Sequence, residues 1–111
     1  MTPEGIVKSQ IRNMLRLMKI VHWNHAASAL SPRGVPDIIG TLPPLGRALY
    51  IEVKAPGKKP SQLQMDFLTE QAGAGAIAFW ADCPQTVVNV LAAHGFEPAK
   101  RIQGMFTGKS I

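Results

Sequence analysis

The chain has 111 residues, a formal net charge of +5 and a 46% share of hydrophobic residues. This length provides for one domain with one modest core, and the single cysteine, Cys83, excludes an internal disulfide framework. No apolar run is long enough to span a bilayer and no secretory leader opens the chain, so we expect a protein of a reducing cytoplasm with no membrane partner.

Basic residues concentrate in the first half of the chain. Residues 1–59 hold nine Lys and Arg against three acids, residues 60–99 hold four acids and no Lys or Arg, and residues 100–111 add three bases. This distribution favours a polyanionic partner such as nucleic acid, although many small basic domains have no such partner. The three acids of the basic half are Glu4, Asp37 and Glu52. Carboxylates isolated in a basic field raise the question of what they bind.

The first predicted element is a helix that begins at Thr2-Pro3-Glu4, with a cap, a proline at the first helical position and an acid in the first turn. Apolar residues then recur at helical spacing, and an adjoining basic stripe consists of Lys8, Arg12, Arg16 and Lys19. Glu4 falls on the boundary between the two stripes, where it can lean toward a site at the edge of the core. A short strand over residues 20–25 follows, and then a loop over 26–34 that is rich in small residues, Pro and Gly.

Residues 37–42 and 47–54 are predicted to be two strands of a hairpin, joined by the turn Pro43-Pro44-Leu45-Gly46. The pattern then predicts a helix over 61–72, an apolar strand over 76–81 that is buried on both faces, and a last helix over 82–94. The order α-β-β-β-α-β-α predicts a three-layer α/β domain around a mixed sheet. We expect residues 1–97 to form this single domain and residues 98–111 to form a basic tail.

The hairpin brings two of the isolated acids together. Apolar and polar residues alternate along residues 49–54, which puts Glu52 and Lys54 on one face of the strand. With the turn centred between Pro44 and Leu45, the numbers of antiparallel partners sum to 89, so Asp37 lies directly opposite Glu52. A slip of one residue would put the two acids on opposite faces.

Two carboxylates that face each other destabilise a hairpin unless a cation lies between them. Asp37, Glu52, the backbone carbonyl of Val53 and waters suit octahedral Mg²⁺. Lys54 lies near enough for its ammonium to reach an attacking water or a phosphoryl oxygen, and such a set of groups is what phosphodiester hydrolysis requires. The alternative is that Glu52 and Lys54 belong to a solvent-exposed strand face and that Asp37 is a turn-former after Pro36.

Two patterns carry a family resemblance: Gly34 and Pro36-Asp37 form a G-x-P-D pattern, and Glu52-Val53-Lys54 form an E-V-K pattern. With them the chain resembles a VRR-NUC domain, a branch of the PD-(D/E)XK nuclease superfamily, from about Glu4 to Leu91. The resemblance implies a restriction-endonuclease-like αβββαβ core with an added C-terminal helix, and a nuclease that depends on Mg²⁺ or Mn²⁺. Similar stand-alone proteins are of phage or bacterial type, which implies the cytoplasm of a bacterial or phage-infected cell.

The resemblance also implies roles for single residues. Asp37 and Glu52 would bind the metal, and Lys54 would assist catalysis. Glu4 matches an acid on the family's first helix and would complete the metal shell; its alternative is a helix-dipole acid. Gln64 matches a glutamine of the family's site and would join the catalytic residues. Its S-x-x-Q spacing from Ser61 also predicts a capping box, and one side chain cannot easily serve both functions.

The remaining candidates concern DNA contacts and the core. Predicted DNA contacts are Lys8, Arg12, Arg33, Lys58 and Lys59, with ordinary solvated side chains as the alternative. His22 and His25 are interpreted as neighbours on one strand face that can approach the site, although structural histidines are more common. Trp23 and Trp80 are expected in the core.

The sequence therefore leads to the hypothesis of a metal-dependent DNA endonuclease that acts on branched DNA, in the manner of Holliday-junction resolvases. Paired cleavage across a junction requires two active sites, so we expect a homodimer. Two alternatives stay open. One is a nuclease of linear duplex DNA, and the other is a non-catalytic nucleic-acid-binding accessory protein that retains the fold.

Overall fold

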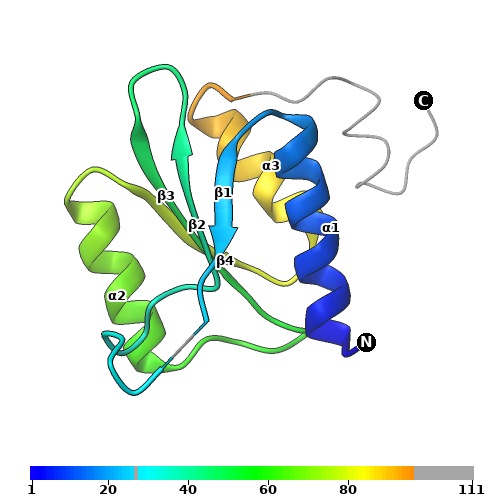
Figure 1. Cartoon of the computed structure of the whole chain (residues 1–111), viewed down its shortest axis with the longest axis vertical. Coiled ribbons are helices and arrows are strands. Elements are labelled where there is room, and N and C mark those ends of the chain that lie inside the picture. The colour runs from blue at the N-terminus through cyan, green and yellow to red at the C-terminus, as the bar shows by residue number, and fades with distance from the viewer. Residues whose placement is uncertain (27, 97–111) are drawn as a thin grey trace.

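The computed structural model describes residues 1–26 and 28–96, which form three helices and one four-stranded sheet (Figure 1). Along the chain the elements are α1 (Pro3–Leu17), β1 (Val21–Asn24), β2 (Ile38–Leu42), β3 (Arg47–Val53), α2 (Gln62–Gly73), β4 (Ile77–Ala81) and α3 (Pro84–Ala93). The predicted order of elements is confirmed. The expected basic tail lies outside the described residues. No helix in the described part of the chain is long and apolar enough to cross a membrane.

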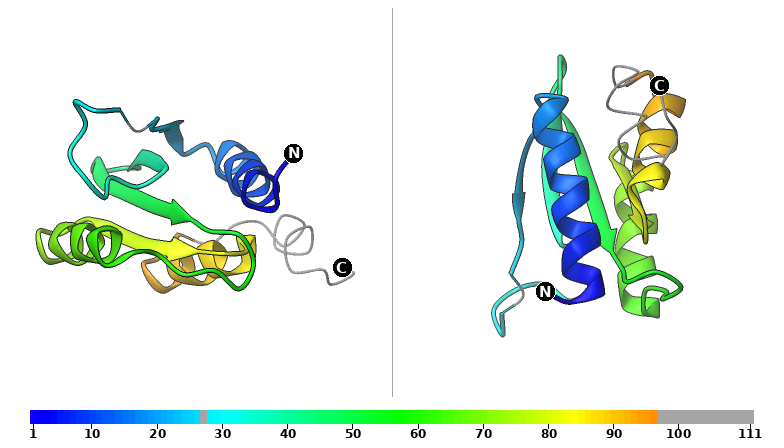
Figure 2. Two further views of the ribbon diagram at one scale, coloured as in Figure 1. Left: turned by 90° about the horizontal axis from the view of Figure 1, so that it is seen from below. Right: turned by 90° about the vertical axis from the view of Figure 1, so that its right-hand side faces the viewer.

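The sheet is mixed and has the order β1-β2-β3-β4. The first two pairings are antiparallel, and β3 pairs with β4 in parallel. Helices α1 and α3 cover one face of the sheet and α2 covers the other, which gives the predicted three layers (Figure 2). The chain thus has the expected α/β architecture, with a C-terminal helix after the last strand.

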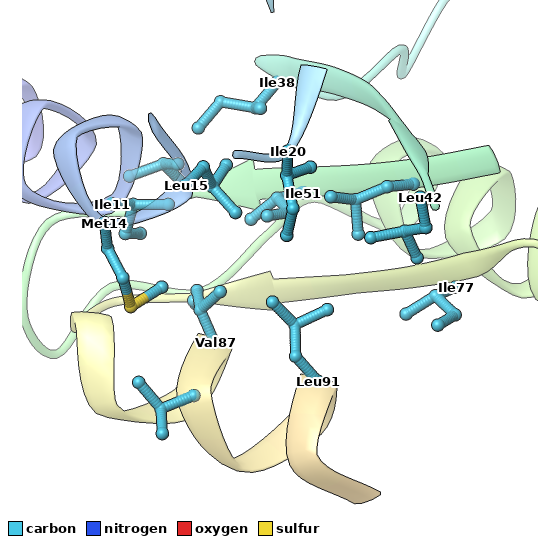
Figure 3. Close-up of a cluster of buried hydrophobic side chains, with 14 of the residues drawn as sticks. Ile11, Met14, Leu15, Ile20, Ile38, Leu42, Ile51, Ile77, Val87 and Leu91 are labelled. Atoms are coloured by element: carbon cyan, nitrogen blue, oxygen red, sulfur yellow. The ribbon is translucent and has the colours of Figure 1, made fainter. Parts of the chain in front are cut away.

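The core lies between the sheet and the pair α1 and α3 (Figure 3). The apolar stripe of α1 is buried there because its residues recur at the spacing of the helix: Val7, Ile11, Met14 and Leu15. Alternate residues of β3 and residues of α3 face it, among them Leu49, Ile51, Val53, Val87 and Leu91. This packing fixes one face of β3 against the core, so the residues between them must point to the other face.

Both edge strands are more exposed than the sequence predicted. Within residues 1–26 and 28–96, strand β4 pairs with β3 alone. The side chains of Ala78, Phe79 and Trp80 stay partly exposed, so the predicted burial of β4 on both faces is wrong for the middle of the strand. Trp23 on β1 is 50% exposed and is not a core residue. The reason is that β1 is the other edge of the sheet, and the helix that packs on it, α1, lies on the opposite face.

Candidate active site

The open end of the β2–β3 hairpin brings the two predicted carboxylates together. Paired residues have numbers that sum to 89, as in Ile38 with Ile51, so the predicted register is confirmed. Asp37 directly precedes β2 and lies at the position opposite Glu52, near the end of β3. Its Oδ2 accepts a hydrogen bond of 2.9 Å from the backbone N–H of Val53, which holds the carboxylate against the end of β3.

Glu52 is a buried charged residue, with 3% of its surface exposed. Its Oε2 accepts a hydrogen bond of 3.0 Å from Nε2 of Gln64 and lies 3.2 Å from Nζ of Lys54. Burial raises the pKa of Glu52 to about 7, and the charge of Asp37 adds to this effect, while the Lys54 ammonium opposes it. The raised pKa means that Glu52 carries only part of its negative charge near neutral pH.

Lys8 lies at this site, which the sequence did not predict. Its Nζ is 3.4 Å from Oδ1 of Asp37, so each of the two carboxylates has one lysine beside it. The sequence placed Lys8 on a stripe that faces DNA, and that role stays a prediction. The contact arises because α1 begins at the same end of the sheet at which β3 ends (Figure 1).

Gln64 makes a capping contact and a contact to Glu52 at once, so the expectation that one side chain cannot easily do both is wrong, while its catalytic role stays a prediction. Its Oε1 accepts a hydrogen bond of 2.8 Å from the backbone N–H of Ser61, while Oγ of Ser61 accepts one of 3.2 Å from the backbone N–H of Gln64. This is the predicted capping box of α2. The same side chain donates from Nε2 to Glu52, because a primary amide has an acceptor and a donor at its two ends.

Gly34 fixes the loop before β2 against α2. Its φ is +78°, and a Cβ atom there would lie 2.5 Å from the backbone carbonyl oxygen of Leu63. A glycine tolerates both this conformation and this close approach. The first residue of the G-x-P-D pattern thus sets the position of a loop that leads directly into Asp37.

The other predicted site residues are less closely placed. Glu4 is half-buried in the first turn of α1, one turn before Lys8, and among the described residues it has no hydrogen bond or ion pair with Asp37 or Glu52. Arg12 lies one turn after Lys8 on α1. The remaining predicted DNA contacts have exposed side chains on the loops next to the site: Arg33, Lys58 and Lys59. Their roles stay predictions.

The two histidines do not share a strand face, so that interpretation is wrong. Residues three apart in a strand point to opposite faces. The backbone N–H of His25 donates a hydrogen bond of 2.7 Å to the carbonyl of Asp37, which places His25 across from Asp37 on the site's side of the sheet. His22 lies on the other face, with Nδ1 2.8 Å from the carbonyl oxygen of Ile20. The alternation of residues along the strand would have separated the two from sequence alone.

The donor set suits a hard divalent cation. Asp37 and Glu52 offer carboxylate oxygens, and Val53, whose backbone N–H bonds to Asp37, has a backbone carbonyl as a further oxygen donor. No group of three or more His, Cys, Asp or Glu residues in the described ranges could hold a metal ion.

The comparisons with known proteins agree with this fold. The family model of the VRR-NUC domain matches residues 4–90. A solved structure described as "VRR_NUC domain" superposes with a TM-score of 0.68 at 24% identity, over 85% of this chain and 98% of that one. No curated protein matches the chain. Because the family match covers most of the chain, including the hairpin and both carboxylates, the protein belongs to the VRR-NUC domain family and has its nuclease-type fold.

Proposed function

We propose that the protein is a divalent-metal-dependent deoxyribonuclease that hydrolyses phosphodiester bonds in branched DNA. The observation that carries the proposal is the pair of carboxylates at the open end of the hairpin, Asp37 and Glu52, each with a lysine within 3.4 Å. A protein that only binds nucleic acid gains nothing from two carboxylates turned toward a polyanion, since they repel it. A hydrolase needs them to hold a cation.

The residues of the site have distinct proposed roles. Asp37, Glu52 and the Val53 carbonyl would hold Mg²⁺ or Mn²⁺, with Glu4 as a further ligand directly or through water. The ion, when bound, supplies Lewis acidity for the phosphate and lowers the pKa of a bound water. Gln64 and Lys54 both contact Oε2 of Glu52, so together they orient the carboxylate.

Lys54 has the position of a group that stabilises charge. Its Nζ is 3.2 Å from Oε2 of Glu52, and its side chain is 18% exposed against 4% for Glu52, so the ammonium is the more accessible partner of the pair. There it orients the attacking water or neutralises charge that develops on a phosphoryl oxygen. Lys8, Arg12, Arg33, Lys58 and Lys59 would bind backbone phosphates around the site.

The test is cleavage of labelled four-way junction, flap, single-stranded and linear duplex DNA in Mg²⁺ or Mn²⁺. We expect the wild type to cleave the junction, and Asp37→Ala to cleave it about a thousandfold more slowly. Glu70→Ala is the matched control, because Glu70 is an exposed acid of α2 and its loss should leave cleavage unchanged. Thermal unfolding confirms that each variant is folded.

Two outcomes would overturn the proposal. One is the absence of metal-dependent cleavage of every substrate, which leaves the accessory DNA-binding protein as the explanation. The other is cleavage that survives Asp37→Ala, which removes the proposed site. Cleavage of linear duplex in preference to junctions would replace branched DNA by duplex as the substrate.

The proposal includes a homodimer. A junction is resolved by two coordinated cuts, and one copy of this domain holds one pair of carboxylates, so two copies must act together. Sedimentation analysis with and without junction DNA tests this arrangement. A monomer under both conditions would contradict paired cleavage by a dimer.

A further inference from the structure

A pocket of about 420 Å³ lies beside the carboxylate pair, between the loop before β2 and the first turn of α2. In Figure 1 this loop runs next to the lower end of α2. Residues that line the pocket include His25, Arg33, Val35, Ser61, Leu63 and Gln64. Its volume is within the range of about 300–1,000 Å³ that small-molecule sites have.

Two residues connect the pocket to the proposed catalytic site. Gln64 lines the pocket and donates a hydrogen bond to Glu52. His25 lines the pocket and is bonded through its backbone N–H to Asp37. Any group that occupies the pocket therefore lies next to the proposed metal site, where the phosphate to be cleaved would bind.

The loop that forms one wall has a defined shape. Gly34 packs so closely on the backbone of Leu63 that it excludes even a Cβ atom. Ser28 and Ser31 join the other part of the loop through a backbone hydrogen bond of 3.1 Å and through Oγ of Ser31, which accepts from the N–H of Ser28 at 3.2 Å. The wall of the pocket next to α2 is therefore held in place by close packing and hydrogen bonds.

The lining combines the chemistry that an unstacked nucleotide requires. Val35 and Leu63 present apolar surface to the faces of a base, and His25 and Arg33 carry planar groups on which a base can stack. The Arg33 guanidinium also suits a phosphate. Nε2 of His25 has no hydrogen-bond partner in the part of the chain that the structure describes and is shielded from solvent, so the imidazole must turn toward the pocket before a ligand can bond to this atom.

We propose that this pocket binds one unpaired nucleotide of the substrate strand, next to the phosphate that is cleaved. This inference rests on the proposed nuclease function and specifies its substrate: DNA with an unpaired nucleotide at the cleavage position. A base pair within a stacked duplex cannot enter a pocket of this size, and a continuous duplex must first be unstacked at a cost. Flaps and strained branch points supply the unpaired nucleotide without that cost.

The experiment fills the pocket without touching the carboxylates. Leu63→Trp enlarges a side chain that is 52% exposed at the pocket, and Leu45→Trp makes the same change in the hairpin turn, where Leu45 is 93% exposed. We expect Leu63→Trp to lower kcat/KM for a flap with unpaired nucleotides at the cleavage position about five- to hundredfold, the range of one lost base-stacking contact. Leu45→Trp should change it less than about twofold, within the range of surface substitutions.

A second measurement does not depend on cleavage. A 2-aminopurine base, placed next to the cleaved phosphate, is quenched when stacked and fluoresces when unstacked. In metal-free buffer, binding of the wild type should keep this base unstacked and Leu63→Trp should abolish the effect. Arg33→Gln is a second variant, which changes an exposed side chain and should weaken binding of the unpaired strand without altering thermal unfolding.

The outcomes separate this inference from the proposed function. Equal kcat/KM values for Leu63→Trp and Leu45→Trp would overturn the proposal that the pocket binds a nucleotide. So would a Leu63→Trp variant that loses the same factor in kcat/KM on paired and on unpaired substrates. A wild type that cleaves no substrate overturns the nuclease proposal instead. The 2-aminopurine signal then decides by itself whether the pocket takes a nucleotide.

Discussion

The two ends of the β2–β3 hairpin are built from the same two strands and differ in almost every other respect. At the turn end Leu45 is exposed and Arg47 donates from Nε to the carbonyl of Gly75 at 2.8 Å. At the open end Glu52 is buried beside Asp37, with a pKa raised to about 7. The turn end buries no charged group, so it has no comparable loss of stability. The open end keeps a buried charge that lowers stability, which is what a site retained for function is expected to do.

Two glycines of the same conformation give the sharpest test of this difference. Gly34 at the open end has a φ of +78° and Gly46 at the turn end has a φ of +79°. The Cβ atom of an alanine at position 34 would lie 2.5 Å from the carbonyl oxygen of Leu63. The Cβ atom of an alanine at position 46 would have Thr41 Cγ2 as its nearest neighbour, at 3.9 Å. We expect Gly46→Ala to cost about 1–2 kcal/mol for the left-handed conformation. Gly34→Ala should cost a further 1–3 kcal/mol or so for overpacking.

Urea unfolding of both variants measures these costs. Because Gly34 also positions the loop that leads into Asp37, Gly34→Ala should lower cleavage as well, and Gly46→Ala should not. Equal stabilities of the two variants would mean that the open end is no more tightly constrained than the turn.

The second test is the pH dependence of stability. Between about pH 4.5 and 7 the unfolded chain has released the Glu52 proton while the folded chain holds it. The folded state then binds more protons, so the free energy of unfolding falls as the pH rises through this range, by about 3 kcal/mol at most. In Glu52→Gln this fall should be absent, and chemical denaturation at pH 4.5, 6 and 7.5 checks it.

The affinity of the protein for divalent cations should depend on pH in the opposite direction to its stability. They bind the ionised form of Glu52, so their apparent affinity for the wild type should rise as the pH rises through about 7. Isothermal titration with Mn²⁺ measures this rise. A wild-type affinity that does not vary with pH would place the cation away from Glu52.

The third test separates the two functions of Gln64. Ser61→Ala removes the capping hydrogen bond that Oγ of Ser61 accepts from the backbone N–H of Gln64, and should cost about 1 kcal/mol. Gln64→Ala keeps that bond but removes the one from the N–H of Ser61 to Oε1 and also the bond to Glu52, and should cost about 2 kcal/mol or more. Each variant thus loses one bond of the capping box, and the additional loss in Gln64→Ala, measured in urea unfolding together with kcat for cleavage, reports the bond to Glu52. If both variants lost the same stability and retained kcat, Gln64 would be a capping residue alone.

The smallest expected effect concerns Lys8. Its ion pair with Asp37 is partly exposed, at 26% and 23%, so Lys8→Met should change stability by less than about 1 kcal/mol. The same substitution removes a cation that competes with a metal ion at Asp37. The affinity for Mn²⁺ should therefore rise up to about fivefold. Arg47→Met at the turn end is the matched control and should leave Mn²⁺ binding unchanged.

The sequence predicted what depends on local rules. The centre of the turn set the register, and the register put Asp37 opposite Glu52. The alternation of residues along β3 assigned Glu52 to the face away from the core. Both conclusions hold because strand geometry has a period of two residues and because the turn fixes the pairing.

Contacts between distant elements could not be predicted in this way. The approach of Lys8 to Asp37 depends on where α1 packs along the sheet, and the bond from Gln64 to Glu52 depends on the distance between α2 and β3. The periodicity of residues along a helix or a strand does not predict either of these distances. Trp23 is expected in the core but is 50% exposed, because β1 is an edge strand of the sheet, and strand order is a tertiary property.

The amide of Gln64 joins the start of a helix to a titrating carboxylate. Protonation of Glu52, or a cation drawn to it, changes the hydrogen bond at one end of this amide while the other end holds the N–H of Ser61. Local unfolding of the first turn of α2 should therefore depend on whether Glu52 is protonated or ionised. Backbone amide hydrogen exchange at Ser61 and Gln64 would therefore record whether a metal ion is bound at Glu52, through one hydrogen bond of the Gln64 amide.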